Sequence, residues 1–219
     1  MIYLFIYNSK DRLTINQERN LINLLPKSYI DSISKIRNNK VKYQKLISRV
    51  LLIYALKENN CLNSLDELMY TEEERPYFSC SNIDFNISYA NSYTVLATST
   101  SGRIGVDIEY VKPILYNKFR RQFTLKEWKF ITTSSNPINA FYFLWTRKEA
   151  LVKVNGKGIM LLPKISALHD LSNIEGEYYS LHNLPILGQK YIIHIATQSN
   201  NKFVRHMIIN ANELYKSVI

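Results

Sequence analysis

Two acidic residues, Asp107 and Glu109, stand two positions apart in the segment Gly-Val-Asp-Ile-Glu (105–109). The apolar residues between and around them predict a strand. Side chains alternate between the two faces of a strand, so both carboxylates point the same way while Val106 and Ile108 pack behind them. The segment therefore predicts two carboxylates presented side by side from one strand.

A third carboxylate, Glu149, follows forty residues after Glu109, with Lys148 before it and Lys153 after it. On a helix, Glu149 and Lys153 lie one turn apart and share a face. Three carboxylates that met beside lysines would repel one another unless a cation neutralised them. Hard oxygen ligands of this kind suit Mg²⁺ bound to phosphate oxygens. The residues therefore predict a divalent cation that holds a polyphosphate.

The segments that position these residues follow from hydrophobic periodicity and from turn residues. The segment 124–127 has the Thr-x-x-Glu spacing of a capping box, which predicts a helix start. Asn155-Gly156 predicts the end of the helix that carries Glu149. The expected helices cover 16–25, 33–56, 124–132 and 141–154, and the expected strands cover 1–7, 68–71, 77–78, 83–88, 93–100, 104–111, 177–181, 190–197 and 203–209.

The composition predicts a folded α+β protein without a membrane span. The chain has 219 residues, of which 46% are hydrophobic and 21% charged, and no segment is low in complexity. No run reaches the roughly 18 apolar residues that a span needs. The first seven residues lack the basic start of a signal peptide, so we expect a cytoplasmic protein. A division at the turn Ser101-Gly102 gives an N-terminal half, 1–101, and a C-terminal half, 102–219.

Charge is distributed unevenly along the chain. Residues 1–60 carry 11 Lys and Arg against four Asp and Glu, residues 61–111 carry two against eight, and residues 112–160 carry ten against two. Basic blocks beside a carboxylate cluster fit an anionic ligand, and the run 112–129 also fits an acidic protein partner. Nucleic acid is the competing partner. The basic blocks lack interleaved aromatic residues or a known binding motif, which argues against it.

Several other chemistries lack their residues. The chain has no P-loop, no dinucleotide-binding glycine motif and no nucleophile elbow. Its two cysteines, Cys61 and Cys80, have no histidine between them and fit neither a zinc site nor a disulfide framework. The four histidines lie in the last quarter without paired spacing, so histidine-based catalysis and zinc binding have little support.

The motifs taken together resemble a known family. Gly-Val-Asp-Ile-Glu, Phe-Leu-Trp-Thr-Arg-Lys-Glu-Ala-Leu-Val-Lys (143–153) and Gly-Lys-Gly (156–158), preceded by Arg-Pro-Tyr (75–77) and Phe-Asn-Ile-Ser (85–88), resemble the 4′-phosphopantetheinyl transferases of the surfactin-synthetase-activating type. The resemblance implies a monomer built from two similar α/β halves in a pseudo-two-fold arrangement. It also implies transfer of phosphopantetheine from coenzyme A to a serine of an apo acyl or peptidyl carrier protein, in polyketide or nonribosomal peptide biosynthesis, with release of adenosine 3′,5′-bisphosphate.

The same resemblance implies a role for each site residue. Asp107, Glu109 and Glu149 would bind Mg²⁺, with Mn²⁺ as the alternative, and Glu149 would also act as the base. Lys148 and Lys153 would stabilise charge on the phosphoryl oxygens. The expected contacts to coenzyme A are made by Arg75, Ser88, Tyr89, Lys148 and Lys153, together with Lys35 and Lys45 from the basic predicted helix, where Arg37, Lys40 and Lys42 remain alternatives.

One position departs from the family pattern. The family usually has histidine after Phe-Asn-Ile-Ser, and this chain has Tyr89. A phenol donates one hydrogen bond and is uncharged near pH 7. This change leaves open a relative that binds coenzyme A or a carrier protein with little or no turnover.

Overall fold

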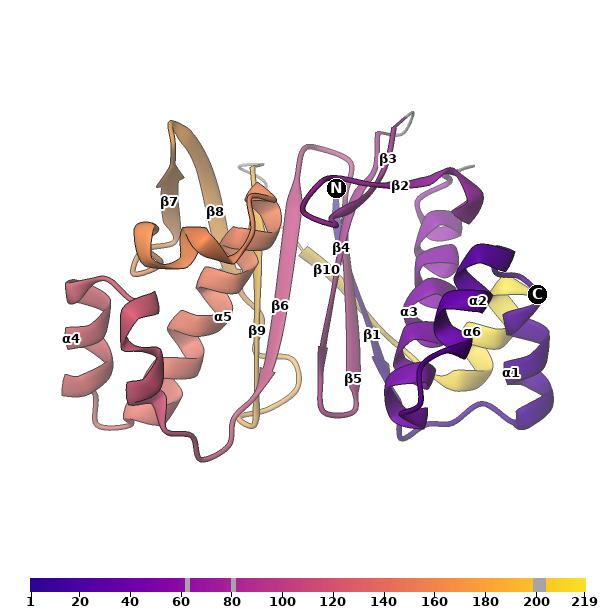
Figure 1. The fold of residues 1–219 in the computed structure, drawn as a ribbon, viewed down its shortest axis with the longest axis horizontal. Coiled ribbons are helices and arrows are strands. Elements are labelled where there is room, and N and C mark those ends of the chain that lie inside the picture. Colours follow the sequence, from indigo (N-terminus) through magenta and orange to yellow (C-terminus); the bar gives the residue numbers. More distant parts are fainter. Residues whose placement is uncertain (62–63, 80–81, 199–203) are drawn as a thin grey trace.

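Two four-stranded sheets form the framework of the protein, with helices packed on their outer faces (Figure 1). The computed structural model describes residues 1–61, 64–79, 82–198 and 204–219. The first sheet has the strand order β10-β1-β5-β4 and the second has the order β6-β9-β8-β7. The strand bounds are β1 Ile2–Asn8, β4 Asp84–Ala90, β5 Tyr93–Ser99, β6 Ile104–Tyr110, β7 Leu171–Ile174, β8 Glu177–Asn183, β9 Tyr191–Thr197 and β10 Val204–Ile209.

The first sheet is buried on both faces because its strands are apolar on both. On β1, Phe5 and Tyr7 pack toward the helices, in a core that includes most of α3. Ile2, Leu4 and Ile6 point the other way and pack against β6 and β9 of the second sheet. The molecule is therefore layered as helices, sheet, sheet, helices, and the inner faces of the two sheets share one core.

Six α-helices are present in the described residues. They are α1 Ile15–Ile22, α2 Lys27–Ser34, α3 Asn39–Glu58, α4 Leu125–Thr133, α5 Pro137–Asn155 and α6 Ala211–Val218. Figure 1 shows α1, α2, α3 and α6 on one side of the molecule and α4 and α5 on the other. No helix among these residues has the length and apolar character needed to cross a membrane.

The N-terminal helices correct the expectation of one long helix over 33–56. The chain ends α2 at Ser34 and starts α3 at Asn39, because Asn38 caps the new helix by accepting hydrogen bonds from the N–H groups of Lys40 and Val41. The other two expected helix boundaries near the site are confirmed. Thr124 and Glu127 form the predicted capping box, and Gly156 ends α5 with a φ of 84°.

The last two elements return to the first sheet. β10 pairs in parallel with β1, and α6 packs on α3, where Lys57 donates hydrogen bonds to the carbonyl oxygens of Ser217 and Val218. The short strands β2 Leu68–Tyr70 and β3 Pro76–Phe78 form a separate ribbon. The division of the chain between residues 101 and 102 stays a prediction. The segment 204–218, which follows this division in the sequence, packs against β1 and α3, which precede it.

Candidate active site

The strand β6 presents Asp107 and Glu109 toward helix α5, as the alternation predicts. Val106 and Ile108 lie on the opposite face, buried against β1 and β9. Gly105 allows the helix to approach this closely, because a Cβ atom there would overlap the carbonyl oxygen of Ala150. The glycine of the Gly-Val-Asp-Ile-Glu segment therefore brings α5, which carries Glu149 and Lys153, onto the face that holds the carboxylates.

Three elements meet at the amine of Lys153. Its Nζ donates to Asp107 Oδ1 at 2.7 Å, to Ser88 Oγ at 3.0 Å and to the carbonyl oxygen of Val106 at 3.1 Å. Ser88, from β4, also donates to Asp107 Oδ1 at 2.8 Å. The Lys153 side chain is 26% exposed, whereas the Asp107 side chain is 7% exposed. Of the residues predicted for the site, the structure thus joins Ser88, Asp107 and Lys153 by direct contact.

The three acids carry more negative charge than the nearby lysine neutralises. Burial, and then the charge of Asp107, raise the pKa of Glu109 to about 7, against the opposing effects of Lys153 and a hydrogen bond with Trp145. The same two causes raise the pKa of Glu149. Asp107 Oδ2 is buried and has no hydrogen-bond partner among the described residues. The electrostatics of the three carboxylates therefore favour the binding of a further cation.

The residues fit a hard metal ion in chemistry, although they are not arranged as a finished site. Among the residues described by the structure, no group of three His, Cys, Asp or Glu side chains lies in a ready metal-binding arrangement. At Asp107, Lys153 and Ser88 donate hydrogen bonds to Oδ1. The free Oδ2 atom and the raised pKa values of both glutamates are what an oxygen-ligand site without its cation would show.

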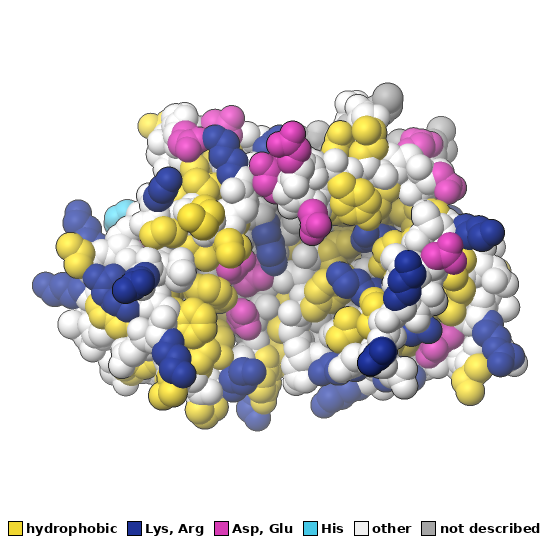
Figure 2. All heavy atoms as spheres, in the orientation of Figure 1, with side chains coloured by type: hydrophobic (Ala, Val, Ile, Leu, Met, Phe, Trp, Pro, Cys, Tyr) yellow, Lys and Arg dark blue, Asp and Glu magenta, His cyan; other side chains and the backbone are white. Residues whose placement is uncertain are grey.

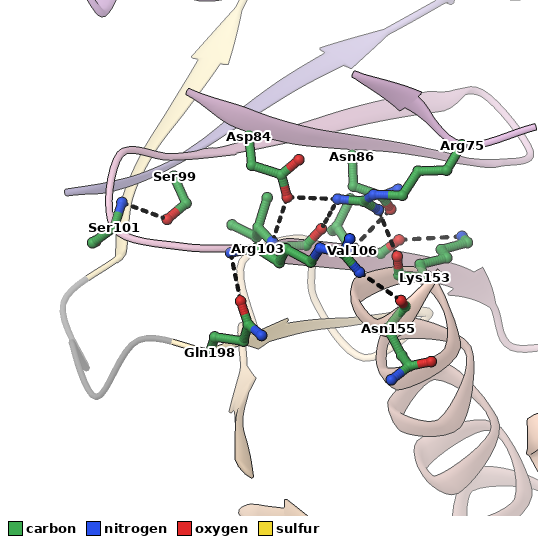
Figure 3. A network of polar contacts seen from close by, with 11 residues as sticks. Arg75, Asp84, Asn86, Ser99, Ser101, Arg103, Val106, Lys153, Asn155 and Gln198 are labelled. Carbon is green, nitrogen blue, oxygen red and sulfur yellow. Dashed lines mark hydrogen bonds and ion pairs between the residues drawn. The ribbon is translucent and has the colours of Figure 1, made fainter. Parts of the chain in front are cut away.

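Side chains of β4 join the first sheet to the second. Asp84 Oδ2 accepts from the N–H of Ile104 at 2.7 Å, and Asn86 Oδ1 accepts from the N–H of Val106 at 3.0 Å (Figure 3). Ser88, next along the same face of β4, reaches Asp107. We call Asp84, Asn86 and Ser88 the seam, because these side chains connect β4 to β6 where the two strands form no backbone pairing. The seam places the Phe-Asn-Ile-Ser motif against β6, the strand that carries Asp107 and Glu109.

Arg75 takes part in this seam, and its contact to coenzyme A stays a prediction. Its guanidinium donates to Asp84 Oδ2 and to the carbonyl oxygens of Lys153 and Ile104 (Figure 3). The residue is 8% exposed. Through these contacts Arg75 ties the start of β3 to β4, to β6 and to the end of α5.

Lys148 lies away from the carboxylates, which corrects its predicted role at the phosphoryl group. Its amine is fully buried and donates to Glu127 Oε2 at 2.7 Å and to the carbonyl oxygen of Ile165 at 2.6 Å. Positions 148 and 153 point about 140° apart around a helix, so the two lysines face different neighbours. The sequence spacing placed Lys148 beside the site, but helix α4 covers it.

A cavity of about 560 Å³ lies on the other side of the seam, between α2, α3, β2, β3 and β4. Tyr89, Lys45 and Arg49 line it, as does Asn86 from the seam. Burial raises the pKa of Tyr89, so it remains a neutral phenol. Lys35 is exposed at the end of α2 and does not line the cavity. Figure 2 shows acidic side chains on the α5 side of the central hollow and basic side chains toward α2 and α3.

Sequence reasoning missed two residues near these groups. Trp145 packs against the core around α5 and also forms a hydrogen bond with Glu109. Arg49, which was not among the predicted site residues, lines the cavity one turn after Lys45. The available signal was the spacing of four between two cations on one helix.

Comparisons with known proteins agree on one family. Residues 103–205 match the 4′-phosphopantetheinyl transferase superfamily. A Haemophilus influenzae protein, provisionally named a 4′-phosphopantetheinyl transferase, is 27% identical over 68% of each chain. The L-aminoadipate-semialdehyde dehydrogenase-phosphopantetheinyl transferase of Schizosaccharomyces pombe is 33% identical over 52% of this chain and 50% of its own length. The 4′-phosphopantetheinyl transferase ffp of Bacillus subtilis is 32% identical over 54% of each chain.

These matches support a transferase, and the α+β architecture fits the fold of that superfamily. The chain spans about half the length of the yeast and Bacillus relatives. The matched segment contains β6 and α5, so it includes all three carboxylates and Lys153.

Proposed function

We propose that the protein transfers 4′-phosphopantetheine from coenzyme A to a serine hydroxyl of an apo acyl or peptidyl carrier protein. The observation that carries this proposal is the contact of Lys153 with Asp107 and Ser88, flanked by Glu109 and Glu149. The seam residues connect this group to the cavity, whose volume is typical of ligand pockets. An ammonium group, three acids and a nearby cavity suit a metal-dependent transfer of a phosphoryl group.

Mg²⁺, or Mn²⁺ in its place, would be held by Asp107, Glu109 and Glu149. Bound there, it would neutralise charge on the pyrophosphate of coenzyme A and make adenosine 3′,5′-bisphosphate a better leaving group. The buried, unpartnered Oδ2 of Asp107 supports this assignment, as do the raised pKa values of the two glutamates.

The remaining chemistry needs only positioning and proton transfer by this chain. The carrier serine oxygen forms a bond to the phosphorus that carries pantetheine, and the bond from that phosphorus to the bridging oxygen breaks. Glu149 takes the serine proton, a role that its raised pKa favours. Lys153 holds a phosphoryl oxygen by a charge-assisted hydrogen bond. The nucleophile belongs to the carrier, which agrees with the lack of a nucleophile motif in this chain.

The finer features of the family are part of the same proposal. The two sheet-and-helix layers would be the pseudo-two-fold halves of a monomer acting in the cytoplasm. The basic run 112–129, in which Lys126 and Lys129 are exposed on α4, would receive an acidic carrier protein. Carriers of polyketide or nonribosomal peptide synthesis are the expected substrates.

The test is the mass of an apo carrier protein after incubation with the enzyme, coenzyme A and Mg²⁺. We expect a gain of one phosphopantetheine group, lost on chelation of the metal and restored by Mg²⁺ or Mn²⁺. Glu149→Gln should abolish the gain in mass. Glu175→Gln should not, because Glu175 is exposed in the turn between β7 and β8.

Two outcomes would contradict the proposal. No mass gain across a panel of acyl and peptidyl carriers would rule out the transferase, and coenzyme A binding without that gain would identify a catalytically silent relative. Binding of nucleic acid that falls steeply with salt and needs no Mg²⁺ would favour the competing partner.

A further inference from the structure

Two arginines from outside helix α5 contact its last turn (Figure 3). The last carbonyl groups of a helix have no partner within the helix. In α5 the carbonyl oxygen of Lys153 accepts a hydrogen bond from Arg75, and that of Asn155 accepts one from Arg103 at 2.8 Å. Arg75 directly precedes β3 and Arg103 directly precedes β6. Other elements of the fold therefore hold the end of α5.

Both arginine side chains lie against Gly156, the glycine that ends the helix. A Cβ atom on Gly156 would lie 3.4 Å from Arg75 Cδ and 3.8 Å from Arg103 Nη1. The negative end of the helix macrodipole lies here, and it attracts cations. Charge-assisted hydrogen bonds to the last carbonyl groups also oppose the fraying that is usual at a helix end. The two arginines therefore stabilise the last turn of α5.

Lys153 is the residue of this turn that reaches the candidate active site. Its amine donates to Asp107, to Ser88 and to the carbonyl oxygen of Val106, while its own carbonyl oxygen accepts from Arg75. The backbone and the amine of one residue are thus fixed by separate elements. Unwinding of the last turn would displace the backbone of Lys153 and draw its amine away from Asp107.

The two arginines differ in how they are held. The Arg75 side chain is 8% exposed, and it also donates to Asp84 Oδ2 and to the carbonyl oxygen of Ile104. Arg103 is exposed, and no carboxylate among the residues that the structure describes forms an ion pair with it. Arg75 therefore joins the helix end to the seam, whereas the contact of Arg103 can be removed without opening the core.

We propose that Arg75 and Arg103 are positioning residues for Lys153. By holding the last turn of α5, they keep its amine beside Asp107 and Ser88, where it would meet a phosphoryl oxygen. The inference rests on the proposed function. Arg103 acts through the helix and touches no reacting atom, so its loss should slow the transfer step and leave the binding of coenzyme A unchanged.

The main test compares Arg103→Gln with wild type. The rate of carrier modification at saturating coenzyme A should fall about tenfold, because small displacements of a reacting group slow a reaction steeply. The dissociation constant of coenzyme A, measured by calorimetry, should stay within about twofold of the wild-type value. The midpoint of urea unfolding should also be that of wild type. Arg19→Gln removes an exposed arginine from the last turn of α1 and should change none of these quantities.

A second measurement needs no turnover. Acetic anhydride modifies lysine amines, and mass spectrometry of the digested protein gives the rate at each lysine. Lys153 should be modified faster in Arg103→Gln than in wild type, because an amine released from Asp107 is more accessible and loses its proton more easily. Arg75→Lys keeps a charge near Asp84 but cannot reach all three acceptors of the guanidinium, so it should have the same effect.

The possible failures are distinguishable. If wild type modifies no carrier protein, the proposed function fails, whereas faster modification of Lys153 in the variants would still support the contact that holds it. If wild type is active and both variants keep its rates of transfer and of Lys153 modification, this inference alone is overturned. Weaker binding of coenzyme A by Arg103→Gln, with Lys153 modified at the wild-type rate, also overturns it, because the arginine would then act on the ligand.

Discussion

Helix α5 carries two lysine–carboxylate pairs that differ in almost every physical respect. Lys148 and Glu127 are both fully buried, and the carboxylate also accepts from the N–H groups of Thr124 and Ala167. Lys153 and Asp107 lie beside the seam, where the lysine is partly exposed and one carboxylate oxygen has no described partner. We call Lys148–Glu127 the closed pair, because both side chains are buried and both carboxylate oxygens accept hydrogen bonds. We call Lys153–Asp107 the open pair, because the lysine is partly exposed and one carboxylate oxygen has no described partner.

The difference separates a stabilising role from a chemical one. A buried ion pair with all its hydrogen bonds made holds α4, α5 and the segment after α5 together, and it offers nothing to a ligand. An ion pair with an exposed cation and a free oxygen can exchange partners. Glu127 and Asp107 therefore provide a direct comparison, since an amide in place of each carboxylate removes one charge with almost no change in shape.

The largest effect on stability should come from Glu127→Gln. This change leaves the buried Lys148 amine without its counter-charge, so we expect the free energy of unfolding to fall by about 3–5 kcal/mol. Urea denaturation would measure it. If the loss were no larger than that of an exposed variant such as Glu175→Gln, the closed pair would not be a structural element.

Asp107→Asn should show the opposite behaviour. The substitution relieves repulsion with Glu109 and Glu149, and Lys153 keeps its access to water, so the free energy of unfolding should change by less than about 1 kcal/mol. Carrier modification should nevertheless fall at least about a hundredfold, because a charged contact at the reaction centre is lost. Retention of activity would place the chemistry elsewhere.

The smallest effect is a change of stability with pH, which arises from the open cluster. Glu109 has an ordinary pKa of 4.5 and a folded-state pKa of about 7, so between these values the folded protein holds a proton that the unfolded chain has released. Its contribution to stability is therefore present below about pH 4.5 and is lost as the pH rises through 7.

Glu109→Gln removes this titration. Without divalent metal, the unfolding free energy of the variant should increase relative to wild type between pH 5 and pH 8. The comparison between proteins cancels the opposing contribution of His194, whose burial lowers its pKa to about 3. The exposed variant Glu72→Gln should follow wild type. If the unfolding free energies of wild type and Glu109→Gln changed in parallel with pH, the pKa of Glu109 would not be raised by the folded structure.

The sequence predicted the open pair and not the closed one. Alternation along β6 and the spacing of four on α5 are local patterns, and they located Asp107, Glu109, Glu149 and Lys153. The closed pair depends on which helix covers Lys148. The capping box identified one role of Glu127, but its contact with a lysine 21 residues away requires the packing of α4 on α5. The protein contacts of Arg75 were not predicted for the same reason, since its acceptors come from β4, β6 and α5.

The fold shows the same limit. Most strands with buried apolar residues were predicted, although β7 was not. The break between α2 and α3 was missed because apolar residues continue across it. Helix α6 was also missed, although Asn210 followed by Glu213 has the spacing of a helix cap and Asn210 does accept from the N–H of Glu213. A strand over 203–209 was expected, of which residue 203 lies outside the described residues, but the pairing of β10 with β1 follows from no local pattern.

That pairing has a consequence for how the chain is assembled. β1 is made before β10, which follows about 200 residues later, so the first sheet lacks one of its strands during that interval of synthesis. Until then the β10 side of β1 keeps an unpaired edge, a common starting point for aggregation. A cut at the predicted division between residues 101 and 102 would also separate β10 from β1 and α6 from α3.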